Sequence, residues 1–229
     1  MTVVIRCYNR PDLLALTLWS VSHSHIPAGT EVWAVHDGPP DWETHLVLEQ
    51  AQHIFHAAGI EFYVEQSPAH LGLHGHAKWT AEHIELEGPF LANLTDDCVV
   101  SPAWLLVLEH LADAARGPEH VGVLSGYRAP WMDEHRDQAG APSHTERCGH
   151  ASVLGLINAG LWRDTLRMFE PGLTVDDRGE PAAFDGELWK RAAELGLLVL
   201  VTQRSLIQHV GLQGVHGRDN PPVLDFVGT

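Results

Sequence analysis

Residues 3–14 read Val-Val-Ile-Arg-Cys-Tyr-Asn-Arg-Pro-Asp-Leu-Leu, and this stretch sets the pattern of the first half of the chain. Its three β-branched residues predict a buried strand, a short polar loop follows, and proline suits the first turn of a helix. Further short apolar runs predict strands at 31–35, 60–64, 89–94 and 121–124, and apolar residues at helical spacing predict helices at 41–58, 75–87 and 102–116. This alternation predicts an α/β fold with a parallel sheet covered by helices on both faces.

The second half of the chain is less regular. Residues 127–150 are rich in charge, glycine, proline and histidine, and we expect them to form a long flexible loop. Helices near 161–168 and 185–195 and a buried strand at 197–201 are expected next. The tail, residues 217–229, contains paired prolines and is expected to lie along the surface.

Composition excludes several classes of partner. The chain has 229 residues, with 14 Lys plus Arg, 30 Asp plus Glu and 17 His, and a formal net charge of −16. A surface with this much negative charge repels phosphate backbones and anionic lipid. We therefore expect no bulk binding to nucleic acid. No apolar run approaches the ~18 residues of a membrane span, and the N-terminus lacks a signal-peptide layout. Three scattered cysteines, Cys7, Cys98 and Cys148, are too few for a disulfide framework, and we expect a cytoplasmic location.

Four polar segments fall where predicted strands end or a late helix begins, and ligands bind at that edge of such sheets. They are residues 7–12, Asp37-Gly38, residues 95–97 and residues 185–187. Of these, Asp96-Asp97 is the most informative pair. At ~4 Å, two like charges near a protein surface repel by about 4 kcal/mol at an effective dielectric of about 20. A divalent cation relieves this repulsion, and a solvated turn is the structural alternative.

Taken in order, these segments resemble the family 2 glycosyltransferases of the GT-A fold. The segments that carry the resemblance are Val3–Pro11 (opening strand and "YNRP" loop), Leu18–Val21 (the next helix), Val35–Gly38 ("DDG"), Gly72–Lys78 ("G…ARN"), Leu94–Asp97 ("DxD"), Phe184-Asp185 ("ED") and Gln208–Gly211 ("HxG"). The resemblance implies one GT-A domain over residues 1–229, with a Rossmann-like, mostly parallel central sheet flanked by helices. Residues 1–100 are then the nucleotide-sugar and metal half, and residues 101–229 are the irregular acceptor half.

Four positions depart from the family pattern. Thr95 replaces the first Asp of the "DxD" triplet, and Phe184 replaces the Glu of "ED". His36 replaces an Asp of "DDG". Lys78 replaces an Arg, which keeps the positive charge but loses the bidentate fork of the guanidinium group.

The resemblance implies a metal-dependent, inverting transfer of a sugar from a nucleotide-diphosphate sugar to an acceptor hydroxyl. Mn²⁺ or Mg²⁺ then neutralises the diphosphate leaving group as a Lewis acid. Asp97 and His209 are the implied metal ligands, and Asp96 contacts the ribose or metal-bound water. Asp185 is the implied general base.

The resemblance also implies a set of donor contacts. Asp37 would accept a hydrogen bond from the imide of the base, which favours a UDP-sugar over a GDP-sugar. The other implied nucleotide-sugar contacts are Tyr8, Asn9, Arg10, Asp12, Gly38, Gly72 and Lys78. On the acceptor side, Trp131 and Trp162 could stack on a sugar ring or lie in the core. Asn158 and Gly160 fall where the family lines its acceptor pocket.

Two other functions stay open at this point. A nucleotidyltransferase also uses a metal-binding Asp pair, but it normally has a glycine-rich phosphate loop, and residues 8–11 contain no glycine. A histidine-rich metal-binding domain would explain the spacing of His70, His74 and His76, which suggests zinc. Gly72 and Gly75 disfavour a helix across these three residues, which argues against the helical geometry of a zinc pair.

Overall fold

The computed structural model describes residues 1–128, 132, 136–137, 141, 143–148, 151–170 and 183–210. The strands are β1 (Thr2–Cys7), β2 (Glu31–His36), β3 (Glu61–Gln66), β4 (Phe90–Thr95), β5 (Cys98–Val100), β6 (Val121–Ser125), β7 (Arg136–Asp137), β8 (Thr145–Cys148), β9 (Gly155–Asn158), β10 (Leu198–Thr202) and β11 (Ile207–His209). The helices are α1 (Pro11–Ser22), α2 (Trp42–Ala57), α3 (Gly72–His83), α4 (Trp104–Ala114), α5 (Ala159–Met168) and α6 (Phe184–Glu194), with a 3₁₀ turn, η1 (Gly117–Glu119).

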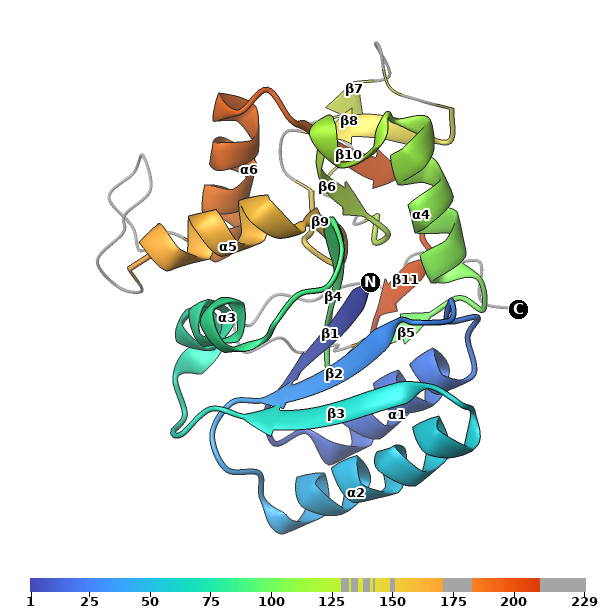
Figure 1. Ribbon diagram of the computed structural model, residues 1–229, viewed down its shortest axis with the longest axis vertical. Helices are drawn as coiled ribbons and strands as arrows, with labels where there is room; N and C mark the ends of the chain where they lie inside the picture. Colours follow the sequence, from blue (N-terminus) through green and yellow to red (C-terminus); the bar gives the residue numbers. More distant parts are fainter. Residues whose placement is uncertain are drawn as a thin grey trace.

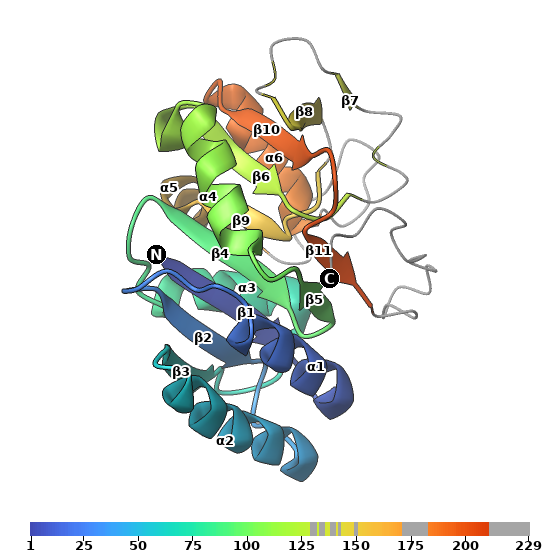
Figure 2. The ribbon, with the colours of Figure 1, turned by 90° about the vertical axis from the view of Figure 1, so that its right-hand side faces the viewer.

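Nine strands form one large sheet in the order β3-β2-β1-β4-β9-β6-β10-β8-β7. The strands β1 to β4 are parallel to one another, and β6 and β10 run in the same direction. Strands β9 and β8 run the opposite way. The separate pair β5–β11 lies beside the end of β4 (Figure 2). The predicted α/β class with a mostly parallel central sheet is therefore confirmed.

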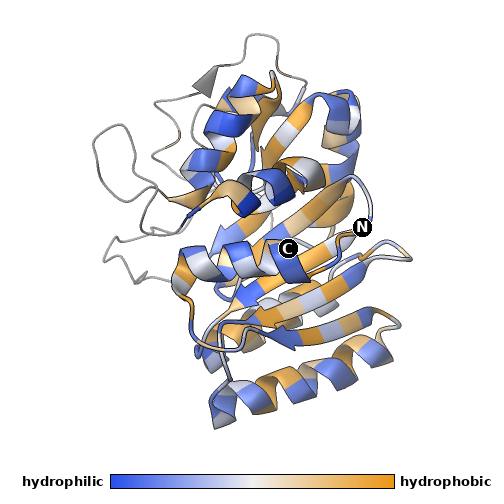
Figure 3. Ribbon diagram, turned by 60° about the vertical axis from the view of Figure 1, so that its left-hand side comes forward, coloured by the Kyte–Doolittle hydropathy of each residue, from blue (hydrophilic) through white to orange (hydrophobic). Residues whose placement is uncertain are grey.

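Two apolar cores pack against the two faces of this sheet, because side chains alternate along each strand. Val3 and Ile5 of β1 point into the core under α1, α2 and α4, whereas Val4 points into the core under α3, α5 and α6. Figure 1 shows these two helical layers, and Figure 3 shows the apolar strands between them. None of the described helices is both long and apolar enough to cross a membrane.

The expectation of a long loop over residues 127–150 is wrong in part. Within it, β8 pairs antiparallel with β10, and β7 pairs with β8. Thr145, Glu146 and Cys148 are buried in this arrangement, although the composition of their segment resembles a loop. The short strands β5, β9 and β11 were not predicted either, because three or four residues are too few to show a period. The tail at 217–229 lies outside the described residues.

Candidate active site

The loops that follow β1, β2 and β4 meet at one edge of the sheet. Register pairs Cys7 of β1 with His36 of β2, and Arg6 with Thr95 of β4. The ladder continues past the strand ends: the N–H of Asp37 donates to the carbonyl of Cys7, and the N–H of Asp96 donates to the carbonyl of Arg6, both at 3.0 Å. Hence the two sequence motifs that end β2 and β4 lie on either side of the end of β1.

Asp96 and Asp97 are buried at this edge, with exposed fractions of 1% and 3%. Arg10 bridges them: its Nε and Nη2 donate to the two oxygens of Asp96, and its Nη1 donates to Oδ2 of Asp97 at 2.9 Å. The hydroxyl of Thr95 donates to Oδ1 of Asp97 at 2.6 Å. Thr95, the residue that departs from the "DxD" pattern, therefore orients Asp97.

His209 joins this cluster from the other end of the chain. Antiparallel pairing of β11 with β5 sets His209 opposite Cys98, and the N–H of Val210 donates to the carbonyl of Asp97. As a result, Nε2 of His209 lies 3.2 Å from Oδ1 of Asp97. Burial by itself would raise the pKa of Asp97, but His209, Arg10 and the Thr95 hydroxyl together hold it well below its ordinary value.

The donor set around Asp97 fits a hard divalent cation. Two carboxylates and one imidazole offer the oxygen and nitrogen ligands that suit Mn²⁺ or Mg²⁺. Among the described residues, no group of three or more His, Cys, Asp or Glu side chains forms a ready-made metal cage. Mg²⁺-type sites are commonly of this open kind, with one or two carboxylates from the protein and the remaining ligands from water and substrate phosphates. The residues present therefore fit a metal that is completed by a phosphorylated ligand.

The loop after β1 is fixed by His36. Nε2 of this buried imidazole accepts from the N–H of Asn9 at 3.2 Å, and Nδ1 contacts the carbonyl of Gly38. Because one ring nitrogen accepts and the other faces a carbonyl, the ring is held as the Nδ1–H tautomer. Asn9 has a left-handed backbone (φ 33°), and its side chain accepts from the N–H of Asp41. His36 thus joins two loops at the site, a role that sequence reasoning missed.

Tyr8 and Asp12 lie at the two ends of the same loop. The backbone N–H of Tyr8 donates to Oδ2 of Asp96 at 2.9 Å. Its half-exposed ring stacks on His70, with ring centres 4.2 Å apart. Asp12 is exposed in the first turn of α1, where a negative charge favours the helix N-terminus. The contact of this loop with the carboxylate cluster is thus made by the backbone of Tyr8.

Asp37 anchors the start of α3. Its Oδ1 accepts from the N–H of Leu71 at 2.7 Å and from the hydroxyl of Ser67 at 3.3 Å. Its Oδ2 accepts from the N–H of Gly72 at 2.9 Å and lies 2.9 Å from Nδ1 of His70. With an exposed fraction of 3%, this carboxylate has its lone pairs directed at the protein. The resemblance implies a base contact for Asp37, but in this arrangement its two oxygens already accept from the backbone N–H groups of Leu71 and Gly72.

Two of the expected glycines have a steric reason for being glycine. Gly38 has φ +85°, and a Cβ there would lie 2.8 Å from the backbone nitrogen of His70. Gly72 has φ +72°, which lets its N–H turn toward Asp37 as α3 begins. Both glycines therefore shape the loop walls of the site.

Asp185 reaches the same edge from the second half of the chain. It lies in the first turn of α6, where its Oδ1 accepts from the N–H of Gly186 at 2.9 Å. Burial raises the pKa of Asp185, against the opposing effects of that hydrogen bond and of the charges of His74 and Arg6. A carboxylate whose proton affinity is raised in this way suits a general base.

Arg6 is a functional candidate that sequence reasoning missed, because it stands inside an apolar strand. It is 4% exposed, its Nε donates to Oδ1 of Asn93 at 3.2 Å, and its guanidinium carbon lies 4.9 Å above the centre of the Phe184 ring. Burial lowers the pKa of Arg6 to about 10, and the charge of Asp185 is the largest effect that opposes this. The charges of Asp96 and Asp97 act in the same direction as that of Asp185.

The expectation that Lys78 faces a diphosphate is not supported by its contacts. Lys78 lies in the middle of α3, and its Nζ donates to the carbonyl of Phe169 and to Oε1 of Glu170, both at 2.9 Å. These partners follow α5, so the lysine ties α3 to the end of α5. Sequence spacing predicts Lys78 near the site, but the packing of α3 directs its side chain toward the end of α5.

The acceptor-side expectations are corrected as well. Asn158 pairs with Phe90 at the start of β4, so it and Gly160 lie at the opposite edge of the sheet from Asp97. Asn158 caps α5 through its contact with the N–H of Leu161. Trp162 is fully buried in the core and cannot stack on a sugar. Trp131 lies outside the described residues.

The histidines near the start of α3 do not form the helical pair that zinc would need. The helix begins at Gly72, so His70 precedes it and cannot share a helical face with His74. Burial, reinforced by the charge of Arg6, lowers the pKa of His76 to about 3, so this ring is neutral. Gly75 nevertheless lies inside the helix, which therefore begins earlier than the predicted residue 75.

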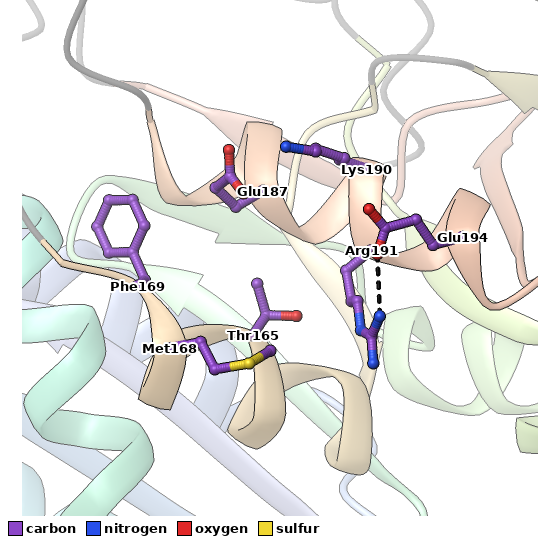
Figure 4. A pocket seen from close by; sticks show the side chains of 7 residues that line it. All are labelled: Thr165, Met168, Phe169, Glu187, Lys190, Arg191 and Glu194. Carbon is purple, nitrogen blue, oxygen red and sulfur yellow. Dashed lines mark hydrogen bonds and ion pairs between the residues drawn. The ribbon is translucent and has the colours of Figure 1, made fainter. Parts of the chain in front are cut away.

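A separate cavity of about 150 Å³ opens between α5 and α6 (Figure 4). It is lined by Thr165, Met168, Phe169, Glu187, Lys190, Arg191 and Glu194. Arg191 and Glu194 form an ion pair at 2.9 Å in its wall. The cavity shares no residue with the cluster around Asp97.

Known structures share this fold. The chain resembles S. aureus TarS (TM-score 0.62, 16% identity, 90% of this chain and 36% of that one) and TarS 1-349 (0.64, 15%, 93% and 60%). It also resembles the mannosyltransferase PcManGT from Pyrobaculum calidifontis, solved with GDP-Man and Mn²⁺ (0.58, 13%, 89% and 54%). The chain thus spans between about a third and three fifths of these solved chains. No curated protein sequence matches it.

A family model gives a direct assignment. The model described as "Glycosyl transferase family 2" matches residues 2–152, which include the loops after β1, β2 and β4. The match covers well over half of the chain. The chain belongs to glycosyl transferase family 2.

Proposed function

We propose that this chain transfers a sugar, with inversion, from a nucleoside-diphosphate sugar to an acceptor hydroxyl in a metal-dependent reaction. The observation that carries the proposal is that Arg6 lies beside both acidic groups. It pairs in register with Thr95, which directly precedes Asp96 and Asp97, and its guanidinium carbon lies 4.9 Å above the ring of Phe184, which directly precedes Asp185. Such a transfer needs a carboxylate group on the diphosphate side, here Asp96 with Asp97. It also needs a separate carboxylate that takes a proton, here Asp185 on α6. Family membership supports the same reaction class.

The roles follow from where each group lies. Asp97 and His209 would hold Mn²⁺ or Mg²⁺, with Asp96 beside them. When bound, the metal supplies charge neutralisation to the departing diphosphate. Asp185 takes the proton from the acceptor hydroxyl, and the hydroxyl oxygen bonds to the anomeric carbon from the side opposite the diphosphate. The carbon–diphosphate oxygen bond breaks with its electron pair, which inverts the configuration at that carbon.

The contacts of Asp37 change the expected preference for the base of the donor. A uridine preference depended on a lone pair of Asp37, and both of its oxygens accept from residues 67–72 or face His70. We therefore propose that Asp37 acts on the base indirectly, by fixing the loop that carries His70. UDP-sugars and GDP-sugars are both to be tested as donors.

The two other functions left open by the sequence lose support. The loop of Tyr8 to Pro11 is shaped by His36 and Asp96 rather than by glycines, unlike a nucleotidyltransferase phosphate loop. The described histidines form no metal cage of the kind a metal sensor needs.

Thermal unfolding of the purified chain, followed by fluorescence, tests the proposal. We expect UDP or GDP to raise the unfolding temperature only when Mn²⁺ or Mg²⁺ is present, and the matching nucleotide-sugars to raise it further. The second readout is glycosyl transfer to water or to a panel of hydroxylated acceptors. It is measured as the amount of nucleoside diphosphate released. Absence of any metal-dependent nucleotide effect would overturn the proposal.

A further inference from the structure

Arg10 neutralises the carboxylate pair in the absence of a metal. Its guanidinium group forms a bidentate pair with Asp96 and a further hydrogen bond to Asp97. The guanidinium group of an arginine keeps its positive charge in proteins, and here it faces both carboxylates. The same oxygens of Asp97 would be needed by a divalent cation. The guanidinium group and a metal therefore compete for the same lone pairs.

The arginine is the exchangeable member of this group. Its side chain is 32% exposed, whereas those of Asp96 and Asp97 are 2% and 4% exposed. Its backbone is fixed at the start of α1, where its carbonyl accepts from the N–H of Leu14. The guanidinium group can therefore turn about a fixed backbone, while the carboxylates cannot leave the edge of the sheet.

Because Lys78 is paired elsewhere, another positively charged side chain is needed to face the diphosphate. A diphosphate beside Asp97 carries negative charge that a single divalent ion does not fully balance. Lys78, which was expected to supply the balance, is held by Phe169 and Glu170. A released Arg10 has the planar fork that binds phosphate oxygens bidentately.

We propose that Arg10 is an exchangeable counter-ion: it occupies the carboxylate pair until a divalent cation displaces it, and it then pairs with the diphosphate of the donor. This inference rests on the proposed metal-dependent transfer, since it assigns a role within that same site. It makes an unusual prediction, namely that removal of a site residue strengthens metal binding.

Calorimetric titration with Mn²⁺ alone, without nucleotide, tests the exchange. We expect Arg10→Gln to bind Mn²⁺ about tenfold more tightly than the unaltered chain, which corresponds to about 1.4 kcal/mol. Arg10→Lys keeps the positive charge but lacks the planar guanidinium group, and its Mn²⁺ affinity should lie between those of Arg10→Gln and the unaltered chain. Arg191→Gln is the matched control, because it removes the same charge from α6, where Arg191 pairs with Glu194; its Mn²⁺ affinity should not change.

A second titration, with inorganic pyrophosphate at saturating Mn²⁺, tests the other half of the exchange. Here Arg10→Gln should bind pyrophosphate at least tenfold more weakly than the unaltered chain. The pyrophosphate affinity of Arg191→Gln should equal that of the unaltered chain. Equal Mn²⁺ affinity in Arg10→Gln and the unaltered chain would overturn the exchange while leaving the metal site intact. If no form of the chain binds Mn²⁺, either alone or together with pyrophosphate, the metal-dependent function fails, and the exchange fails with it. If Arg10→Gln is less stable, the rise in its unfolding temperature on adding Mn²⁺ should exceed that of the unaltered chain.

Discussion

Nε2 of His209 lies 3.2 Å from Oδ1 of Asp97, although more than a hundred residues separate them in the chain. Two short strands create this contact, because β11 pairs with β5 directly after the Asp96-Asp97 turn. The contact shows how the "HxG" segment is placed: the imidazole of His209 faces Asp97 instead of packing as a core histidine.

Replacement of Asp97 by alanine should abolish metal-dependent nucleotide binding. The reason is that Asp97 offers the lone pairs nearest to His209, and without it the diphosphate has no bound counter-charge. Calorimetry with UDP and GDP in the presence of Mn²⁺ measures the effect. Asp113→Ala, which removes an exposed carboxylate from α4, is the control and should bind like the unaltered chain. An unchanged Mn²⁺-dependent affinity in Asp97→Ala would contradict the assignment.

Replacement of Asp185 by asparagine should leave donor binding intact and lower the rate of transfer by about 10²–10⁴-fold, the usual share of a general base. Asparagine keeps the size of the side chain but cannot take a proton. Single-turnover transfer at saturating donor measures the effect. Glu187→Gln alters the next carboxylate along α6 and should transfer at close to the normal rate. Near-normal turnover in Asp185→Asn would remove Asp185 from the mechanism.

The pH dependence of kcat should show an acidic limb above the ordinary range of an aspartate. Burial raises the pKa of Asp185, and a general base acts only when deprotonated, so the rate falls as the pH drops through that raised value. Steady-state transfer rates from pH 4 to 8 would show the limb, and circular dichroism at each pH would show that the chain stays folded. A rate that is flat down to pH 4 would argue against Asp185 as the base.

Replacement of Asp37 by asparagine should destabilise the fold as well as weaken nucleotide binding. The amide NH₂ would face the N–H groups of Leu71 and Gly72, and an unsatisfied buried donor costs about 1–3 kcal/mol. For a chain of this size, each kcal/mol lowers Tm by about 2–4 °C. Thermal unfolding measures the change, with the exposed Asp164→Asn as control. A Tm equal to that of the unaltered chain would show that Asp37 does not anchor α3.

Much of the fold could be predicted from local pattern. Val3 to Ile5 and the other apolar runs mark strands because each is bounded by polar turns, and the stripe in α4 marks a helix because its apolar residues recur at helical spacing. The segments that carry Asp37 and Asp97 could be placed at one edge, since carboxyl ends of parallel strands share an edge. Strands β8 and β9 could not, because their pairing depends on distant partners rather than on their own composition.

The sequence by itself determined the α/β class, the family and the residues that line the strand ends, because these depend on short-range periodicity and on the chemistry of adjacent side chains. Only the tertiary structure decided the partners of the charged groups. It paired Arg10 with Asp96 and Asp97, turned Lys78 toward Glu170 and buried Arg6 against Phe184. A local pattern cannot predict such pairs, because the free energy of a buried charge is set by whichever opposite charge the long-range packing brings next to it.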